Sequence, residues 1–218
     1  MKQALLFFSF SVIITSCARK KMIERVDRYN IRTIAILPVQ LEVTGSMPKN
    51  VTAEQFQKTV EEHRKFMYQS LYIDLVQFYD YRTRNYSQVQ FQSIDKTLKL
   101  MNEKGMTDST AWQMDPQELA RILNVDAVVT MRVTQNRIMR DEIALGVDVI
   151  GGIVNQTIPR LNLPTGAART SDMYVNCALV KGSYTMWSTR FRNQTDWNYP
   201  VQQAIQSVTR GIANSFPL

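Results

Sequence analysis

The chain has 218 residues, of which 44% are apolar and 10% aromatic, and this globular composition excludes a disordered or fibrous protein. That length allows one domain of ordinary size with a buried core. The formal net charge of +7 suits an acidic partner. The sequence contains no zinc-finger spacing, no RNA-recognition signature and no block of five basic residues, so we expect no nucleic-acid binding.

The first predicted element is a signal peptide over residues 1–16. Lys2 supplies a positive start, and nine of the eleven residues in 4–14 are apolar. A transmembrane helix needs about 20 predominantly apolar residues, whereas basic residues begin here at Arg19. We therefore favour a cleaved signal over a retained membrane anchor. Ordinary secretion with a nearby cleavage site is the other alternative.

The end of the apolar run, Ile14-Thr15-Ser16-Cys17, resembles the bacterial lipobox, in which small residues precede a lipid-bearing cysteine. The resemblance implies that Cys17 is the lipid attachment site and becomes the mature N-terminus, held at a membrane by palmitate-type acyl chains. Ala18 is not the aspartate that retains lipoproteins in the inner membrane. We therefore expect an outer-membrane protein that faces the periplasm.

After a lipidated tether over residues 17–30, we expect a single domain over residues 31–218. Residues 31–39 are rich in β-branched side chains and are closed by Pro38, which is typical of a buried strand. A long helix is predicted over residues 52–81, because apolar side chains recur there at steps of three and four. The positions on this face are Phe56, Val60, His63, Met67, Leu71, Leu75 and Phe78.

Strands and helices then alternate along the chain. We predict a strand over residues 89–92 and a helix over residues 93–105. Another helix is expected from Asp115 to Asn124, since Pro116 is tolerated in a first helical turn. Residues 126–139 alternate in polarity and predict a strand with one buried side. That side carries Ala127, Val129, Met131 and Val133.

Residues 141–170 have an apolar stripe at helical spacing that glycines weaken. The alternatives for this segment are an apolar helix on the sheet and a surface that meets the membrane or a neighbouring subunit. A hairpin over residues 171–193, turning near Gly182, follows. An amphipathic helix after Pro200 is the last predicted element, with Val201, Ile205, Val208, Ile212 and Phe216 on one face.

No motif for a reaction, a metal or a cofactor is present in the sequence. His63 is the only histidine, and its place on an apolar helix face indicates a partly buried, hydrogen-bonded core residue. Cys177 aligns with apolar positions of a strand, which indicates a buried, inert thiol. Asp115 and Glu118 lie where a helix start favours negative charge. We therefore expect a protein that is not an enzyme and has no cofactor, metal or small-molecule substrate.

Three segments resemble a known family: RTIAILPV at 32–39, ELARILNVDAVVTMRV at 118–133 and MWSTRF at 186–191. With the lipobox and a last helix ending in FP, they are similar to envelope lipoproteins of the fold shared by CsgG, LpoB and the TolB N-terminal domain. The resemblance implies an α/β (α+β) fold with a mixed β-sheet packed with helices. It also implies a small lipoprotein of the Bacteroidetes type with a non-enzymatic role in envelope assembly, secretion or regulation.

Our first hypothesis is a lipid-anchored adaptor that acts by contacts with an envelope protein or by self-association. Its interface would use residues 141–170 and tyrosines of the long helix, namely Tyr68, Tyr72, Tyr79, Tyr81 and Tyr86. The alternative for these tyrosines is that they simply cover a large sheet. The second hypothesis is a binding module for a cell-wall glycan or anionic polymer. Its basic residues would be Arg82, Arg84, Arg190 and Arg192, which are alternatively an ordinary solvated surface. An enzyme is a third hypothesis, without a nucleophile or base that we can place.

Overall fold

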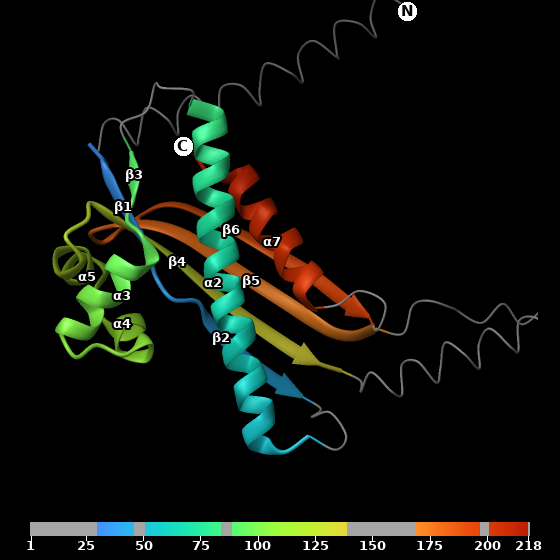
Figure 1. Cartoon of the computed structure of the whole chain (residues 1–218). Coiled ribbons are helices and arrows are strands. Elements are labelled where there is room, and N and C mark those ends of the chain that lie inside the picture. Colours follow the sequence, from blue (N-terminus) through green and yellow to red (C-terminus); the bar gives the residue numbers. More distant parts are fainter. Residues whose placement is uncertain (1–29, 46–50, 84–88, 139–168, 197–200, 218) are drawn as a thin grey trace, which may run out of the picture.

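The computed structural model describes residues 30–45, 51–83, 89–138, 169–196 and 201–217, and in this part six strands form one mixed sheet (Figure 1). The strands are β1 (Thr33–Ile36), β2 (Gln40–Gly45), β3 (Gln90–Phe91), β4 (Ala127–Arg137), β5 (Arg169–Lys181) and β6 (Tyr184–Asp196). The helices are α2 (Ala53–Thr83), α3 (Ile94–Glu103), α4 (Asp108–Gln113), α5 (Pro116–Leu123) and α7 (Val201–Ser215). The expected α+β fold with a mixed sheet is confirmed.

Strand β4 is the centre of the sheet, whose order is β3-β1-β4-β5-β6 with β2 also paired to β4. β1 and β2 run parallel to successive parts of β4, whereas β5 runs antiparallel along its other side and forms a hairpin with β6. Val128 and Val129 point to opposite faces, and both are fully buried. Helices therefore cover both faces of the sheet near the start of β4.

Helices α2 and α7 lie side by side on one face of the sheet (Figure 1). The predicted stripe of α2 provides Met67, Leu71 and Leu75, each at most 1% exposed. From α7, Ile205 and Ile212 enter the same core and are equally buried. Burying each such side chain contributes about 1.5–3 kcal/mol. Both amphipathic predictions are confirmed, and this layer contains the main core.

The smaller helices α3, α4 and α5 form a second layer on the opposite face, next to the start of β4 (Figure 1). Leu119 and Leu123 of α5 pack there in one buried cluster with Ala35, Leu37 and Val128. These three helices cover only one end of that face. The same face is exposed farther along the strands, at Arg132 and Asn136 for example.

Capping residues begin and end the predicted short helices. The Ser93 side chain accepts a hydrogen bond from the Lys96 N–H at the start of α3. The Asp115 carboxylate accepts one from the Gln117 N–H at 2.8 Å at the start of α5. Asn124 ends α5 in the left-handed conformation with φ of 53°. The predicted helices at residues 93–105 and 115–124 are therefore confirmed, and the role of Asp115 is that of a cap.

The predicted strand at residues 31–39 is shorter in the structure, and a second strand follows it. β1 ends at Ile36, and β2 begins at Gln40 and pairs with the second part of β4. Helix α4, which Thr107 begins with a capping box, is a further element that the sequence analysis missed. The predicted hairpin is confirmed, with Gly182 in its turn.

The predicted apolar stripe of residues 141–170 lies almost wholly outside the described residues. The last two residues of that range, Arg169 and Thr170, belong to β5. Within the described part of the chain, no helix combines the length and the apolar character that crossing a membrane requires.

Candidate functional site

The part of the sheet that none of the described helices covers carries a polar surface, which we call the open sheet face. Along each strand alternate side chains point to this face, on the side away from α2 and α7. Its members are Gln40 and Glu42 of β2, Arg132 and Thr134 of β4, Asp172, Tyr174 and Asn176 of β5, and Arg190 and Arg192 of β6. Three arginines outnumber two acidic residues, so the formal net charge of this face is positive.

One row of the open sheet face crosses four strands. The register places Gln40 beside Arg132, Arg132 beside Asn176, and Asn176 beside Arg190. Neighbouring strands lie about 4.8 Å apart, so the row presents two guanidinium groups on either side of an amide. Arg190 is exposed, and within the described residues it has no acidic partner in an ion pair.

Arg132 is held in place from two sides. Its Nε donates to the Gln40 Oε1 at 2.7 Å, and its guanidinium carbon lies 5.6 Å from the centre of the Trp112 ring. Trp112 is itself fixed, because its indole N–H donates to the Pro38 carbonyl at 2.9 Å. A cation over an aromatic face gains about 0.5–1 kcal/mol at an exposed site. The Arg132 side chain is therefore held in a preformed orientation.

The neighbouring row is anchored by a buried carboxylate. Arg192 lies opposite Tyr174 on the paired strands, and its guanidinium carbon is 5.4 Å from the Tyr174 ring centre. Its terminal nitrogen also lies 3.4 Å from the Asp172 carboxylate, which is buried. Tyr174 donates to the same carboxylate at 3.4 Å. Arg192 is thus partly neutralised, and Arg190 is the more available charge on β6.

The outer side of β6 is an edge of the sheet. β6 has 13 residues and pairs with β5 on its inner side. On its outer side no strand of the described part of the chain pairs with it. The β6 side chains on the face opposite the open sheet face pack under α7. One of them, Phe191, lies so close to Gly211 that a Cβ added at Gly211 would be 3.0 Å from the Phe191 ring. In the middle of β6 the exposed side chains are those on the open sheet face, such as Ser188, Arg190 and Arg192.

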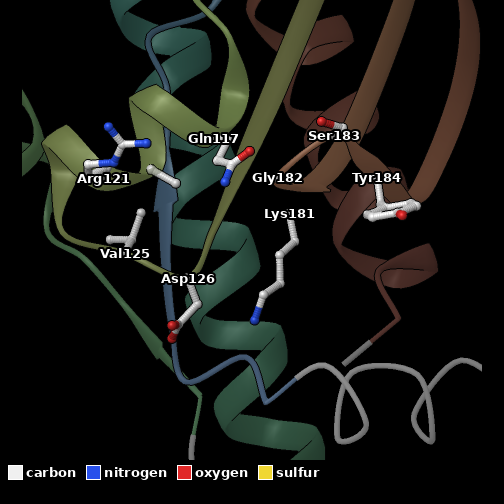
Figure 2. A pocket seen from close by; sticks show the side chains of 9 residues that line it. Gln117, Arg121, Val125, Asp126, Lys181, Gly182, Ser183 and Tyr184 are labelled. Carbon is white, nitrogen blue, oxygen red and sulfur yellow. The ribbon is translucent and has the colours of Figure 1, made fainter.

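A pocket of about 530 Å³ lies at the other end of the hairpin, between α5 and the β5–β6 turn (Figure 2). Its lining residues are Gln117, Ala120, Arg121, Val125, Asp126, Lys181, Gly182, Ser183 and Tyr184. In Figure 2 the Lys181 side chain extends toward Asp126, while Ser183 lies at the opposite end of the pocket. The lining therefore does not bring the Ser183 hydroxyl and the Lys181 amine together as a nucleophile and base would be.

Asp126 in this pocket has a structural task. Its carboxylate accepts hydrogen bonds from the Arg32 N–H at 2.9 Å, the Thr33 N–H at 2.8 Å and the Thr33 hydroxyl at 3.0 Å. Partial burial opposes ionisation, but these hydrogen bonds, together with the charge of Lys181, lower the pKa of Asp126. The group is thus an ionised anchor for the start of β1, and all three of these hydrogen bonds end on its Oδ2 atom.

The tyrosine interface proposed from the sequence is partly wrong. Tyr68 is buried, and its hydroxyl donates to the Ile36 carbonyl at 2.8 Å. Tyr79 is also buried and accepts a hydrogen bond from the Val89 N–H at 3.1 Å. Both belong to the core because their hydroxyl groups find partners inside the protein. Tyr72 is partly buried against the same core, Tyr81 is exposed, and Tyr86 lies outside the described residues.

The other residues that the sequence indicated as candidates lie in different parts of the chain. Arg190 and Arg192 come together on the open sheet face, whereas the Arg82 side chain and Arg84 lie outside the description. Cys17, the predicted lipid attachment site, also lies outside it. Among the described residues no cluster of His, Cys, Asp and Glu has the geometry of a metal site. Glu118 is exposed in the first turn of α5, as expected for a helix start.

His63 and Cys177 are buried to different degrees. The His63 ring is half-buried on α2, and burial lowers its pKa. The positive charge of Arg137 also lowers this pKa, whereas the negative charge of Glu62 raises it. The expected hydrogen bond of its ring is not found with any described residue. Cys177 is fully buried as predicted, and burial raises the pKa of its thiol to about 12.

Sequence reasoning missed Arg132 and Trp112 as members of this surface. Residues 126–139 were predicted to have one buried side, and the polar positions on the other side, including Arg132, were the available signal. Trp112 lies on α4, which was not predicted, so its contact with Arg132 had no signal in the sequence.

The described residues form an α+β domain with a mixed sheet, one face of which the described helices cover only in part. No family model and no curated protein matches the chain. Among the solved structures that resemble it at low similarity are three bacterial proteins. Lipoprotein GNA1162 from Neisseria meningitidis has 14% sequence identity and a TM-score of 0.45, and the match covers 85% of this chain and 99% of that chain. The LpoB C-terminal domain from Salmonella enterica has 9% identity and a TM-score of 0.35, with 75% of this chain and 83% of that chain covered. A neuraminyllactose-binding hemagglutinin homologue from Helicobacter pylori has 12% identity and a TM-score of 0.36, with 86% of this chain and 84% of that chain covered. At these TM-scores the likeness assigns neither a family nor a function to this chain.

Proposed function

We propose that this protein is a lipoprotein of the bacterial outer membrane that faces the periplasm and acts without catalysis, through contacts with other envelope proteins. The observation that carries the proposal is the sequence Ile14-Thr15-Ser16-Cys17 at the end of a short apolar run. Two or three acyl chains on Cys17 make release from a bilayer negligible, because each buried CH₂ contributes about 0.8 kcal/mol.

The proposed tether sets how far the domain reaches from its membrane. Residues 17–30 separate the lipid from the folded part that begins near Asn30. A fully extended chain spans at most about 3.5 Å per residue, so this tether reaches roughly 50 Å at most. The domain would meet partners that lie on or near the same membrane.

The lipid anchor is tested by acyl labelling of cells grown with a palmitate analogue. We expect Cys17→Ala to lose the label and to leave the membrane fraction. Cys177→Ala is the matched control, since it removes the other cysteine, which is buried in the sheet, and it should keep the label. Label that persists in Cys17→Ala would show that the lipobox interpretation is wrong.

The role in protein contacts is tested by cross-linking in native membranes followed by purification. We expect defined cross-linked products that contain an envelope protein or a second copy of the chain. The aromatic and aliphatic side chains that remain exposed on the described surface, such as Tyr81 at 74% and Ile73 at 49%, support such contacts. A chain that stays strictly monomeric and cross-links to nothing would overturn this part of the proposal.

A second candidate function is binding of a cell-wall glycan or another anionic polymer. The observation in its favour is that Arg132, Arg190 and Arg192 lie on one face of the sheet. Affinity for an anionic polymer should then fall steeply with added salt, since such contacts are screened within about 10 Å at 0.1 M ionic strength. Affinity that does not depend on salt, or on Arg190→Ala, would exclude this function.

A further inference from the structure

The edge of β6 has the length and accessibility of a strand-addition site. Thirteen residues rising about 3.3 Å each give an edge of roughly 40 Å, more than twice the usual strand length. In an antiparallel ladder alternate residues direct their N–H and C=O groups away from the paired strand. Within the described residues these groups of β6 meet no second strand. Such an edge is a ready template for an extended segment of another chain.

The side chains beside this edge define what the incoming strand must carry. On the open sheet face β6 presents Ser188, Arg190, Arg192 and Gln194, at alternate positions. An added strand would place its own alternate side chains about 5 Å from these. On the other face β6 is covered by α7, where the Asn193 amide donates to the Ala204 carbonyl at 3.4 Å. Charge selection is therefore possible on the open sheet face alone.

The charges on this face favour an acidic strand over a second copy of β6. Arg190 has no acidic partner within the described residues, and Arg132 lies two strands behind it in the same row. Two β6 strands paired antiparallel about residue 191 would bring Arg190 of each copy opposite Arg192 of the other. Like charges placed directly opposite destabilise a strand pair. Glutamate or aspartate side chains at alternate positions of an added strand would instead pair with Arg190. They would also pair with Arg192, which already lies beside Asp172.

We propose that the outer edge of β6 binds an extended acidic segment of a partner protein, which joins the sheet as an additional strand with its carboxylates on the open sheet face beside Arg190 and Arg192. This inference rests on the proposed function, because it names the surface and the partner chemistry of the protein contacts. Backbone hydrogen bonds give such a complex its affinity, and the paired charges fix its register.

The probe for this site is a short synthetic peptide that alternates glutamate with valine. The full chain purified in detergent is titrated with the labelled peptide by fluorescence anisotropy, and amide hydrogen exchange is measured with and without it. We expect saturable binding and slower exchange of β6 amides. A peptide of equal charge in which proline replaces valine loses half of its backbone N–H donors and has its φ angles fixed near −65° at every second residue, so it should bind at least about tenfold more weakly.

Two variants separate the site from charge in general. Arg190→Glu should weaken peptide binding by at least about tenfold, since juxtaposed like charges oppose association. Lys58→Glu makes the same charge change at an exposed position of α2, on the opposite side of the sheet, and should leave binding unchanged. Circular dichroism of each variant confirms that it is folded. Arg190→Gln removes the charge without reversing it, so its affinity for the peptide should lie between those of the wild type and Arg190→Glu.

Three results would overturn the inference. They are equal binding of the two peptides, unchanged β6 exchange, and a dimer held by β6 that excludes the peptide. Preference for a soluble anionic polysaccharide over both peptides would favour the polymer function instead. Absence of acyl label from the wild-type chain, or label that persists in Cys17→Ala, would contradict the proposed anchor but leave the peptide results intact, so the two failures are distinguishable.

Discussion

The Asp126 carboxylate fastens the start of β1 to the start of β4 through three hydrogen bonds. We predict that Asp126→Ala lowers the free energy of unfolding at pH 7 by about 2 kcal/mol, because it leaves two backbone N–H groups without their charged acceptor. Urea denaturation of both proteins measures this difference. Asp80→Ala, which removes an exposed carboxylate from α2, is the matched control and should change the stability little.

The same carboxylate gives a defined pH dependence. The pKa of Asp126 is lower in the folded state, so its contribution is fully present above the unfolded value of about 3.9. The contribution is lost as pH falls through the still lower folded pKa. The stability difference between the wild type and Asp126→Ala should therefore shrink below about pH 4. A difference that stays constant from pH 7 to pH 3 would contradict the role assigned to the ionised carboxylate.

Cys177 offers a direct test of burial. Its thiol is fully buried and burial raises its pKa to about 12, so almost no thiolate exists at pH 8. We predict that N-ethylmaleimide does not modify Cys177 in the folded protein and modifies it completely in 6 M guanidinium chloride, on the order of the concentration that unfolds stable domains. Mass spectrometry of the peptide that contains Cys177 measures the reaction. Rapid modification of the folded chain would show that this strand is not covered as described.

At the residue scale the sequence predicted burial better than it predicted surface. Cys177 and the stripe of α2 follow the spacing of apolar residues, which local pattern alone reveals. Tyr68 and Tyr79 were assigned to an interface, because a tyrosine carries both an apolar ring and a polar hydroxyl. Their burial depends on acceptors and donors that are 32 and 10 residues away in sequence, and no local pattern contains such pairs.

Among the elements, the end of β2 depends on one glycine. Gly45 has φ of 93°, in a region that other residues rarely adopt, and an added Cβ would overlap the carbonyl oxygen of Arg137 on β4. We predict that Gly45→Ala lowers the free energy of unfolding by about 3 kcal/mol, which thermal denaturation measures. Gly105→Ala is the control, since φ there is also positive but no atom lies within 4 Å of the added Cβ. If both variants lose equal stability, the close approach to Arg137 has no role.

The predicted elements were accurate where the chain carries its own start and stop signals. Asp115 with Pro116, and Asn124 at the other end, define α5 from sequence, and Gly182 defines the hairpin turn. β2 lacks such signals, because it is half polar and becomes a strand only through pairing with β4. α4 has six residues, fewer than two turns, which is too few for a periodic pattern to indicate. The open sheet face depends on strand register and could not be predicted from a single sequence.

At the scale of the whole molecule, a chain of aromatic rings crosses the helix-covered face. Phe216 lies 5.1 Å from Trp187 of β6 and 6.2 Å from Phe91 of β3, measured between ring centres, and Phe91 lies 5.7 Å from Tyr79 of α2. One residue beyond α7 thus joins the first and last strands of the sheet order. Aromatic pairs of this geometry contribute about 0.5–1.5 kcal/mol beyond the area they bury.

We predict that Phe216→Ala lowers the free energy of unfolding by about 3–5 kcal/mol, as truncation of a buried phenylalanine does elsewhere. Urea denaturation followed by circular dichroism measures the stability, and tryptophan fluorescence, to which Trp187 contributes as one of three tryptophans, follows the same transition. Tyr81→Ala removes an aromatic ring that is 74% exposed and should cost less than about 0.5 kcal/mol. Equal losses in the two variants would show that the ring chain does not support the core.

The position of Phe216 also bears on when the chain can fold. The sheet takes its first strand from residues 33–36, and its main core needs α7 and residue 216. Because nearly the whole sequence separates these parts, their contacts form only after the last of them has been synthesised, and such long-range topologies fold slowly. The growing chain therefore lacks its complete core for most of its synthesis, and a chain without fixed tertiary structure is the form in which a polypeptide can pass through a narrow membrane channel.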